Sequence, residues 1–512
     1  MSLRLLRVFF AALLMVVVVP RALAQATPVV ERDSPCSTFK VTFDKDAISK
    51  PYSGRVYVVL SIDSGEPRRR MGDWMHPGQV FALDVKDIVP GASVEIDQAG
   101  LAFPKSWVDA MGPNYRVQAV AKVDPDCPRP GDGAGDLYSD VVVASFAKEG
   151  GPLELTLKHA NVPPAFKETG RVKLFEMQSP SLSAFYGRPF TLRAGVVLPK
   201  DYNPEHHYPA AYFITGFGGS HRSAFGLVGM LDHSPAADKC LMIVPDPTCG
   251  LGHSVFADSA NNGPWGKALT EELIPAVEKK YHGPGEGTAR DATAKRYVFG
   301  ISSGGWSSLW LQVAYPDVFD GVWSHCPDPV DFHDFQRIDL YAKGANMCKD
   351  EKGERRPLAR QGGKVTIWYD DFVRQETVLG PGGQIHSFEA VFSPREDGRP
   401  RPLFDRATGD VDPVTSKAWE PYDINLKLTR EWPALKQKLA GKLHIYAGGI
   451  DTFYLEGAVK RLKASLEKLG SDAEIRIVDG MPHAIYPGGI DDMFQTIARD
   501  TSTPKPQDAG KP

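Results

Sequence analysis

The sequence predicts an α/β fold in which a doubly wound, mostly parallel sheet follows a small all-β domain. Short β-branched runs separated by Gly, Pro and Asp fill the chain from about residue 39 to 146. After Val172, apolar strand-like runs alternate with longer helical patterns, which is typical of a parallel sheet covered by helices. A chain of 512 residues is longer than one core usually organises, so two domains are expected.

The first 24 residues have the pattern of a secretory signal peptide. Arg4 and Arg7 precede an apolar run over 8–19, and Ala22-Leu-Ala24 forms an A-x-A cleavage site before Gln25. The run is too short and wrongly flanked for a permanent membrane anchor, and no second apolar stretch of spanning length follows. We therefore expect removal of residues 1–24 and a soluble protein that is secreted or periplasmic.

Residues 25–148 are expected to form the all-β domain, an immunoglobulin-like sandwich. Its expected strands are 54–62, 80–85, 115–123 and 141–146. Export permits disulfides, and the six cysteines allow up to three. Cys36 and Cys127 are the only two before residue 240, so they are expected to form a bridge across this domain. The pairing of the other four stays open: Cys240, Cys249, Cys326 and Cys348.

A linker rich in Gly and Pro is expected over 149–171, and the α/β domain over 172–500. The clearest helices are 267–280 and 455–469. Residues 350–430 interrupt the alternation and are expected to form an insertion that caps the substrate, while 501–512 are expected to be a disordered tail. The expected strands are 192–198, 210–215, 241–244, 297–300, 321–324, 443–447 and 475–478.

The segment Gly300-Ile-Ser-Ser-Gly304 directly follows an apolar strand and matches the G-x-S-x-G nucleophile elbow. Ser302 is therefore the candidate nucleophile. A side chain at either glycine would collide with the neighbouring strand or helix in the sharp turn that exposes the serine hydroxyl. The helix expected over 306–314 would direct its N-terminal amides at developing negative charge.

An elbow serine needs a base and an acid that follow it in the order Ser, Asp or Glu, His. His483 lies in a turn directly after the last expected strand and is the candidate base, although a plain surface-loop histidine is the alternative. Asp451 follows the strand 443–447 and is the favoured acid, with a helix N-cap as its alternative role. Asp328 and Asp331, one strand earlier, are competing acids.

The glycine-rich loop Gly216-Phe-Gly-Gly219 follows an expected strand, and there a backbone amide can turn inward because no Cβ blocks it. We expect the amides of Phe217 and Ser303 to form the oxyanion hole. The alternative is a tight turn without a catalytic part. Further residues that could line the pocket are Gly216, Gly218, His253, Asn262 and Trp265.

Neither a metal nor an organic cofactor is expected. The spacing of Asp405, Asp410 and Asp412 does not fit an EF-hand loop, and a Thr-Gly turn explains this cluster more simply. The chain has 59 Lys and Arg against 63 Asp and Glu, without a basic patch or a run of like charge. This balance argues against nucleic acid and membrane-surface partners, and it leaves the oligomeric state open.

From about Val172 to Phe494 the chain resembles the Putative esterase family of α/β-hydrolases, which contains esterase D, feruloyl esterase and enterochelin esterase domains. Members hydrolyse carboxylic esters through Ser-His-Asp/Glu, so the resemblance implies those roles for Ser302, His483 and Asp451. Thr215 stands where relatives usually have a histidine, and the resemblance does not include the N-terminal domain. The segments that carry it are 198–202 with Tyr208-Pro209, 216–219, 262–265, 272–275, 300–305 and Pro482-His483.

These observations predict an exported serine esterase that forms an acyl-enzyme and acts on a small-molecule or carbohydrate-linked ester. An acyltransferase with the same serine and histidine is an alternative that product analysis would separate. A binding protein with a disused hydrolase fold is another, and it predicts a lost triad member. Carbohydrate binding by the β domain also stays open, although Trp74 and Trp107 are of a type that more often packs in a core.

Overall fold

The computed structural model describes residues 28–232, 239–285 and 295–502. The expected signal peptide, 1–24, lies outside these residues. The expected tail also lies outside them from residue 503 onward, and its first two residues end helix α11 (Pro487–Ser502). None of the helices in the described part of the chain is long and apolar enough to span a membrane.

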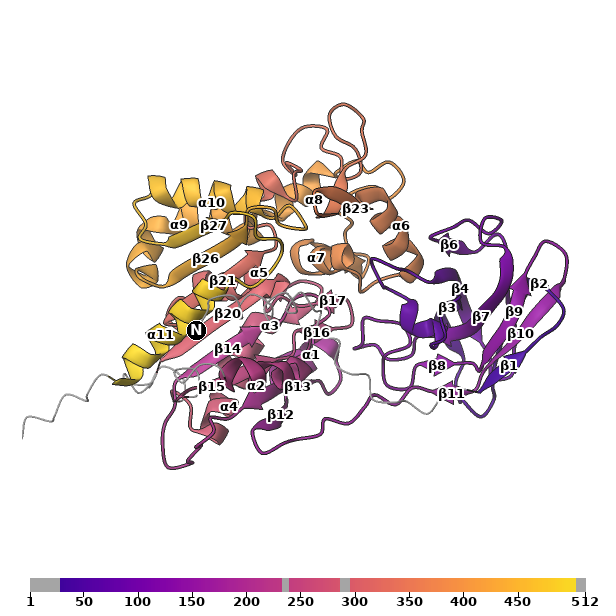
Figure 1. Ribbon diagram of the computed structural model, residues 1–512, viewed down its shortest axis with the longest axis horizontal. Helices are drawn as coiled ribbons and strands as arrows, with labels where there is room; N and C mark the ends of the chain where they lie inside the picture. Colours follow the sequence, from indigo (N-terminus) through magenta and orange to yellow (C-terminus); the bar gives the residue numbers. More distant parts are fainter. Residues whose placement is uncertain (1–27, 233–238, 286–294, 503–512) are drawn as a thin grey trace, which may run out of the picture.

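The N-terminal region is built almost entirely of strands (Figure 1). Its main sheet path runs β10-β2-β9-β7-β3-β4-β6, and the four strands expected here all form. The strands are β1 (Val29–Glu31), β2 (Cys36–Phe43), β3 (Tyr52–Ser61), β4 (Gln79–Ile88), β5 (Ser93–Ile96), β6 (Leu101–Phe103), β7 (Gly112–Ala121), β8 (Leu137–Tyr138), β9 (Val141–Phe146), β10 (Gly151–Leu157) and β11 (His159–Ala160).

The larger of the two apolar clusters in this region forms its main core. Its centre is aromatic, with the ring centroids of Phe81 and Trp107 4.5 Å apart and those of Phe39 and Phe146 5.4 Å apart. Strand β10 belongs to the same sheet because it pairs in parallel with β2. Residues 151–160 therefore continue the strand region, whereas the sequence pattern placed them in a linker. Gly151 and Pro152, which suggested a linker, are the first two residues of β10.

The expected Cys36–Cys127 bridge is not formed, and none of the six cysteines is in a disulfide. Cys36 is buried in β2, where its Sγ donates to the carbonyl oxygen of Ser145 at 3.4 Å. Cys127 lies in the loop after β7, with its Sγ directed at the carbonyl oxygen of Arg129 at 3.5 Å. That loop leaves the sheet to contact the α/β region, which places the second thiol away from β2.

The α/β region is a sheet of eight strands in the order β12-β13-β15-β14-β20-β21-β26-β27. Strands β12 and β13 run antiparallel to their neighbours, and the others are parallel. All seven expected strands form, and β12 is an additional edge strand. Their bounds are β12 (Val172–Gln178), β13 (Thr191–Val197), β14 (Ala210–Ile214), β15 (Leu241–Pro245), β20 (Arg296–Ser302), β21 (Gly321–Pro327), β26 (Leu443–Gly448) and β27 (Glu474–Val478).

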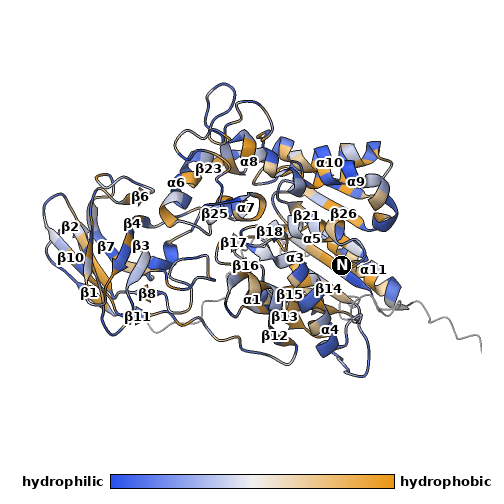
Figure 2. Cartoon of the chain, turned by 180° about the vertical axis from the view of Figure 1, so that it is seen from behind, coloured by the Kyte–Doolittle hydropathy of each residue, from blue (hydrophilic) through white to orange (hydrophobic). Residues whose placement is uncertain are grey.

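Helices cover both faces of this sheet. Central strands such as β14 and β21 are buried along their whole length, and β14 is coloured mostly as hydrophobic in Figure 2. Helices α2 (Ala224–Asp232) and α11 pack with apolar residues of one face. The other face packs against α4 (Ile274–Tyr281), α5 (Ser303–Ala314), α9 (Ile424–Leu439) and α10 (Glu456–Lys468).

An insertion separates β21 from β26 and lies beside the N-terminal region (Figure 1). Its helices and strands lie between Pro357 and Ala418, within the expected range of 350–430. Arg55 of β3 donates to the carbonyl oxygens of Thr377 and Val378 at 2.6 and 3.0 Å, and Tyr57 donates to that of Leu379 at 2.6 Å. The insertion contains β22 (Pro357–Gln361), β23 (Lys364–Trp368), α6 (Tyr369–Leu379), α7 (Gln384–Phe392), β24 (Arg395–Glu396), β25 (Arg399–Pro400) and α8 (Pro413–Ala418).

Candidate active site

Strand β20 ends at Ser302, where the chain turns sharply into α5. Ser302 has φ 61° and ψ −128°, a conformation that is strained for a residue with a side chain. A Cβ on Gly300 would collide with the carbonyl oxygen of Gly304, and one on Gly304 would collide with that of Ile214. The two glycines therefore permit the close strand-to-helix contact that the elbow requires.

The hydroxyl of Ser302 faces a buried carboxyl group. Its Oγ lies 3.4 Å from Oδ1 of Asp328, which follows β21. Oδ2 of Asp328 accepts from Ser303 Oγ at 2.5 Å and from Gln384 Nε2 at 3.2 Å. Burial raises the pKa of Asp328 to about 6, although these hydroxyl groups oppose the shift. Gln384, from the insertion, carries no sequence motif that could have predicted it.

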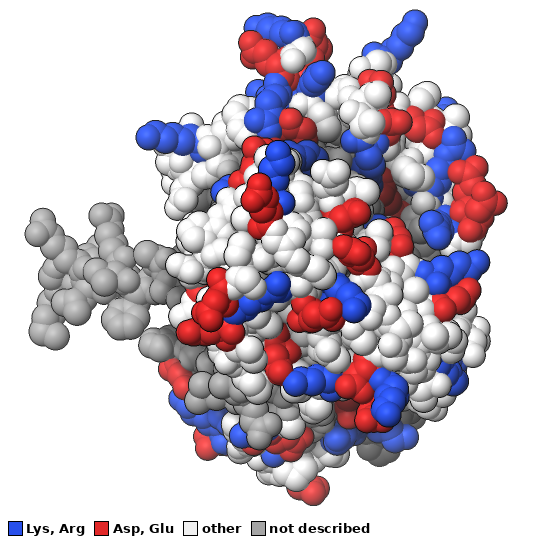
Figure 3. Space-filling model, turned by 90° about the vertical axis from the view of Figure 1, so that its right-hand side faces the viewer, with Lys and Arg blue, Asp and Glu red and all other residues white. Residues whose placement is uncertain are grey.

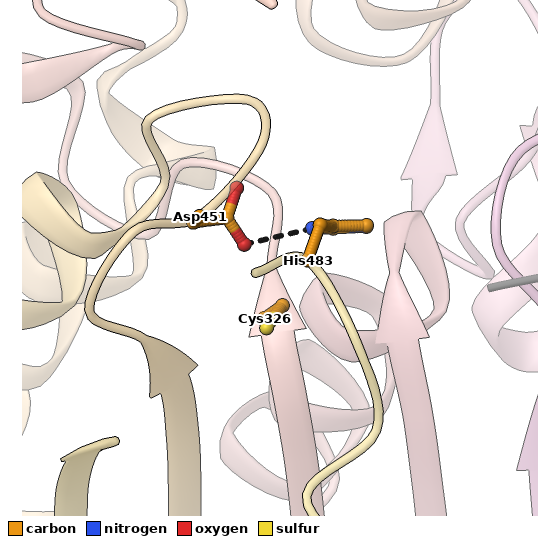
Figure 4. A group of neighbouring side chains, drawn as sticks. All are labelled: Cys326, Asp451 and His483. Atoms are coloured by element: carbon orange, nitrogen blue, oxygen red, sulfur yellow. Dashed lines mark hydrogen bonds and ion pairs between the residues drawn. The ribbon is translucent and has the colours of Figure 1, made fainter. Parts of the chain in front are cut away.

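His483 and Asp451 meet above the carboxyl ends of β26 and β27. His483 Nδ1 lies 2.8 Å from Asp451 Oδ2 (Figure 4). The other carboxylate oxygen, Oδ1, accepts from the backbone N–H of Phe453 at 2.8 Å. The loops after β26 and β27 lie in close contact, which brings Asp451 and His483 together. A glycine at position 448 permits this contact, because a Cβ there would collide with the carbonyl oxygen of Met481.

The ion pair changes the pKa of both groups. Burial alone would lower the pKa of His483, but the Asp451 carboxylate raises it well above its usual value. Burial would raise the pKa of Asp451, and the His483 imidazole lowers it below its usual value. Both shifts favour the charged pair, so Asp451 is suited to stabilise an imidazolium.

Cys326 is a neighbour that the sequence did not indicate. Its Sγ donates to the carbonyl oxygen of Ala484 at 3.3 Å. The thiol and the facing atoms of Asp451 and His483 lie within 4.8 Å of one another (Figure 4). Burial raises the pKa of this thiol, so it is expected to stay protonated beside the pair.

The competing acid Asp331 lies in a different environment. Its Oδ2 accepts from Asn425 Nδ2 at 2.6 Å and from Arg461 Nε at 2.9 Å. Its Oδ1 accepts from the backbone N–H of His333 at 2.9 Å, which caps a short 3₁₀ turn. These bonds indicate a structural role for the Asp331 carboxylate. Of the three candidate acids, Asp328, Asp331 and Asp451, it is Asp451 that is hydrogen-bonded to His483.

The loop 216–219 passes close to the candidate nucleophile, Ser302. A Cβ placed on Gly216 would lie 3.3 Å from Ser302 Cβ and 3.9 Å from its Oγ. The hydrogen bonds of the described residues leave the Phe217 N–H without an acceptor. Ser303 is the first residue of α5, so its N–H also belongs to the helix terminus beside Ser302.

His253, a predicted pocket residue, is hydrogen-bonded to the residue before this loop. It is buried, its Nε2 lies 2.9 Å from the carbonyl oxygen of Thr215, and its Nδ1 accepts from the Val255 N–H at 3.0 Å. This pattern assigns the neutral tautomer with hydrogen on Nε2. Burial lowers the pKa of His253 to about 4, so the tautomer persists at neutral pH.

Two predicted pocket residues have structural contacts instead. Trp265 is 1% exposed and packs in the main core against Phe190 and Phe256. Asn262 is equally buried, and its carbonyl oxygen accepts from the Tyr186 hydroxyl at 2.9 Å. The polar composition of their segment suggested a pocket lining, but it reflects the turns that lead into α3 (Trp265–Lys267).

Comparisons with solved structures found similar proteins at low identity. One is a ferulic acid esterase (14% identity, 65% of this chain and 98% of that chain, TM-score 0.37). Another is an S-formylglutathione hydrolase from Agrobacterium tumefaciens (15% identity, 65% and 95%, TM-score 0.37). A third is FphF, a fluorophosphonate-binding serine hydrolase from Staphylococcus aureus (14% identity, 65% and 100%, TM-score 0.38). No curated protein matches the chain.

A family model gives the assignment. Residues 187–430 match the family Esterase, described as "Putative esterase". The match begins before β13, includes the elbow and Asp328, and ends before Asp451 and His483. The segment 187–430 thus belongs to the Putative esterase family, and the protein is a carboxylic ester hydrolase with an α/β-hydrolase fold.

Proposed function

We propose that this protein is an exported serine esterase in which Ser302, His483 and Asp451 form the catalytic triad. The observation that carries the proposal is the 2.8 Å bond between His483 and Asp451 at the same edge of the sheet as the elbow. The chain order Ser, Asp, His is that of α/β-hydrolases. Export rests on the signal-peptide pattern of residues 1–24.

In the acylation step, Ser302 Oγ attacks the ester carbonyl carbon while Nε2 of His483 takes the hydroxyl proton. The carbonyl oxygen becomes an oxyanion. As this intermediate collapses, the bond to the alcohol oxygen breaks and Nε2–H protonates that oxygen. Water then repeats the sequence on the acyl-enzyme, releasing the acid and restoring Ser302. Asp451 holds Nδ1–H throughout and stabilises the imidazolium.

Before attack, the Ser302 hydroxyl has to leave Asp328. Among the described residues no hydrogen bond joins Ser302 to His483, and the hydroxyl rests on Asp328 instead. Rotation about the Cα–Cβ bond moves a serine oxygen between staggered positions at low cost. Hydrogen bonds in substrate-free sites often tighten only when substrate binds, so this resting position is compatible with the triad.

The oxyanion is assigned to the amides of Phe217 and Ser303. The position of Gly216 against Ser302 and the unused N–H of Phe217 support this assignment. A fixed pair of amides stabilises the tetrahedral intermediate more than the ground-state carbonyl because the negative charge develops on that oxygen. His253 is assigned a positioning role, since it binds the Thr215 carbonyl immediately before the loop.

Two domains are proposed to carry these functions. Residues 28–160 are assigned to an immunoglobulin-like sandwich, supported by their separate aromatic core. Residues 172–502 are assigned to the catalytic domain, and about 161–171 connect the two.

Covalent labelling tests the nucleophile. A fluorophosphonate probe is expected to add to Ser302, and peptide mass spectrometry identifies the modified residue. Ser302→Ala should remove the adduct, whereas Ser303→Ala should keep it. An adduct on another residue in the wild type would overturn the assignment. Hydrolysis of 4-nitrophenyl acetate with and without glycerol separates an esterase, which releases acetate, from an acyltransferase, which forms acetylglycerol.

A further inference from the structure

The N-terminal region contributes an aromatic side chain to the surroundings of the active site. Trp74 lies in the loop between β3 and β4, and its ring contacts three rings of the catalytic domain. It stacks on Phe217 with 5.8 Å between centroids and an interplanar angle of 19°. It also meets Phe372 and Phe453 edge to face, at 5.0 and 6.1 Å.

These contacts place Trp74 beside both halves of the proposed machinery. Phe217 belongs to the oxyanion loop. Phe453 follows Asp451, and its ring meets that of His483 at 5.0 Å and 84°. Trp74, Phe217 and Phe453 are each only partly buried, in contrast to Phe372, which is 2% exposed. Each of these three residues therefore keeps some solvent-accessible surface.

The loop that carries Trp74 is held firmly against the catalytic domain. Asp73 Oδ1 accepts from the N–H groups of Met75 and His76 at 3.0 and 2.9 Å. The carbonyl oxygen of Asp73 accepts from Gln375 of α6 at 2.9 Å. Close by in the same interface, Arg129 donates to the carbonyl oxygen of Gly218 at 3.1 Å. Bonds on both sides of the cluster thus fix the N-terminal region against the oxyanion loop.

The chemistry of the reaction indicates which part of the ester meets these rings. Nε2–H of His483 protonates the departing alcohol oxygen, so the alcohol part of the ester lies on the histidine side of the scissile bond. Phe453 packs on His483, and Trp74 packs on Phe453. Aromatic rings bind flat apolar groups through area burial and stacking.

We propose that Trp74 is a specificity-determining residue that binds the alcohol part of the ester and favours an apolar group of ring size there. This inference rests on the proposed function, because it uses the role of His483. It makes the N-terminal region part of the substrate site. A purely structural Trp74 would instead hold the two regions together and affect all esters equally.

Two esters with one acyl group and alcohols of similar acidity test the proposal: benzyl acetate and ethyl acetate. Trp74→Ala is expected to lower kcat/KM for benzyl acetate about tenfold and for ethyl acetate less than about twofold. Trp74→Phe should retain most of the preference for the benzyl ester. The matched control is Met75→Ala, since Met75 is the adjacent residue and is 46% exposed; it should change neither value.

A second measurement does not depend on the folding of Trp74→Ala. Benzyl alcohol should inhibit the wild type at far lower concentration than ethanol, and Trp74→Phe should retain most of this difference. Equal losses for both esters, or no loss for either, would contradict the role of Trp74. Different results would contradict the two proposals. If Ser302→Ala keeps the activity on 4-nitrophenyl acetate, the triad assignment is wrong. If the activity depends on Ser302 but Trp74→Ala does not selectively lower kcat/KM for benzyl acetate, only the inference about Trp74 is wrong.

Discussion

Nδ1 of His483 bonds to Oδ2 of Asp451 at 2.8 Å, although the two residues are 32 positions apart in the chain. The bond places hydrogen on Nδ1, so in the neutral imidazole Nε2 is the atom that accepts a proton from Ser302 in the proposed triad. Because the Asp451 carboxylate is buried and accepts through its other oxygen from the backbone amides of Phe453 and Leu455, its orientation is fixed. In the proposed triad, the acid therefore acts mainly by orienting and stabilising the imidazole.

Ser302→Ala should lower ester hydrolysis by at least about 10⁴-fold, because the covalent step needs the hydroxyl. Ser303→Ala is the matched control, since only its amide is assigned a catalytic role. The kcat of Ser303→Ala should fall by less than about tenfold, although this variant loses the hydrogen bond from Ser303 to Asp328. The kcat of both variants on 4-nitrophenyl acetate decides this, and equal inactivation would count against Ser302.

Asp451→Asn should lower kcat by up to about 10⁴-fold while the fold is kept, because asparagine favours the wrong imidazole tautomer. Asp331→Asn should give the opposite result. It weakens the ion pair with Arg461 and therefore lowers the melting temperature, with little effect on kcat. Kinetics and thermal melts of both proteins separate the roles; an active Asp451→Asn would mean that the residue only caps the turn after β26.

Asp328 should make stability depend on pH. Its folded-state pKa of about 6 lies above the reference value of 3.8, so the folded protein binds the extra proton between these values. The free energy of unfolding therefore falls as pH rises from about 4 to 6. Asp328→Asn removes this loss and should be more stable than the wild type at pH 7, by on the order of 2–3 kcal/mol.

The gain from Asp328→Asn should vanish below about pH 4, where the wild-type carboxyl group is neutral in both states. Denaturant unfolding at pH 4, 5, 6 and 7 measures it. A difference between the two proteins that is the same at every pH would show that Asp328 does not titrate in this range.

His253→Ala should lower kcat by about tenfold with little change in KM, because the oxyanion loop loses the bond that holds the Thr215 carbonyl. Loss of an oxyanion donor itself costs about 10²–10³-fold, and loss of a supporting residue should cost less. His206→Ala is the control, since His206 is exposed. A rise in KM at constant kcat would assign His253 to substrate binding instead.

Thiol titration under denaturing conditions should find six free cysteines, and a reductant should leave the melting temperature unchanged. Alkylation before unfolding should modify Cys127 before Cys36, because Cys127 is partly exposed and Cys36 is buried. Peptide mapping that finds Cys36 joined to Cys127 would contradict the structure.

Local patterns in the sequence predicted much of the fold. Most strands of the α/β sheet contain an apolar run that marks them in the sequence. The elbow and the two loops after β26 and β27 follow from chain order, which is why Ser302, Asp451 and His483 could be named as candidates. Contacts between distant segments could not be predicted in this way. A strand pattern does not specify its partner, so β10 was taken for a linker and Cys127 was placed beside Cys36. Trp74 reaches the site only through the packing of two regions.

The bonds of Arg55 and Tyr57 to the last turn of α6 have a further consequence for protein engineering. The final carbonyl groups of a helix need partners from outside that helix, and here they come from residues 322 and 323 positions earlier in the chain. A catalytic domain cloned without the N-terminal region would lack these hydrogen-bond donors for the last carbonyl groups of α6. A chimaera with a different N-terminal region should therefore keep an arginine and a tyrosine at the positions of Arg55 and Tyr57. Their side chains complete the hydrogen bonding at the end of α6.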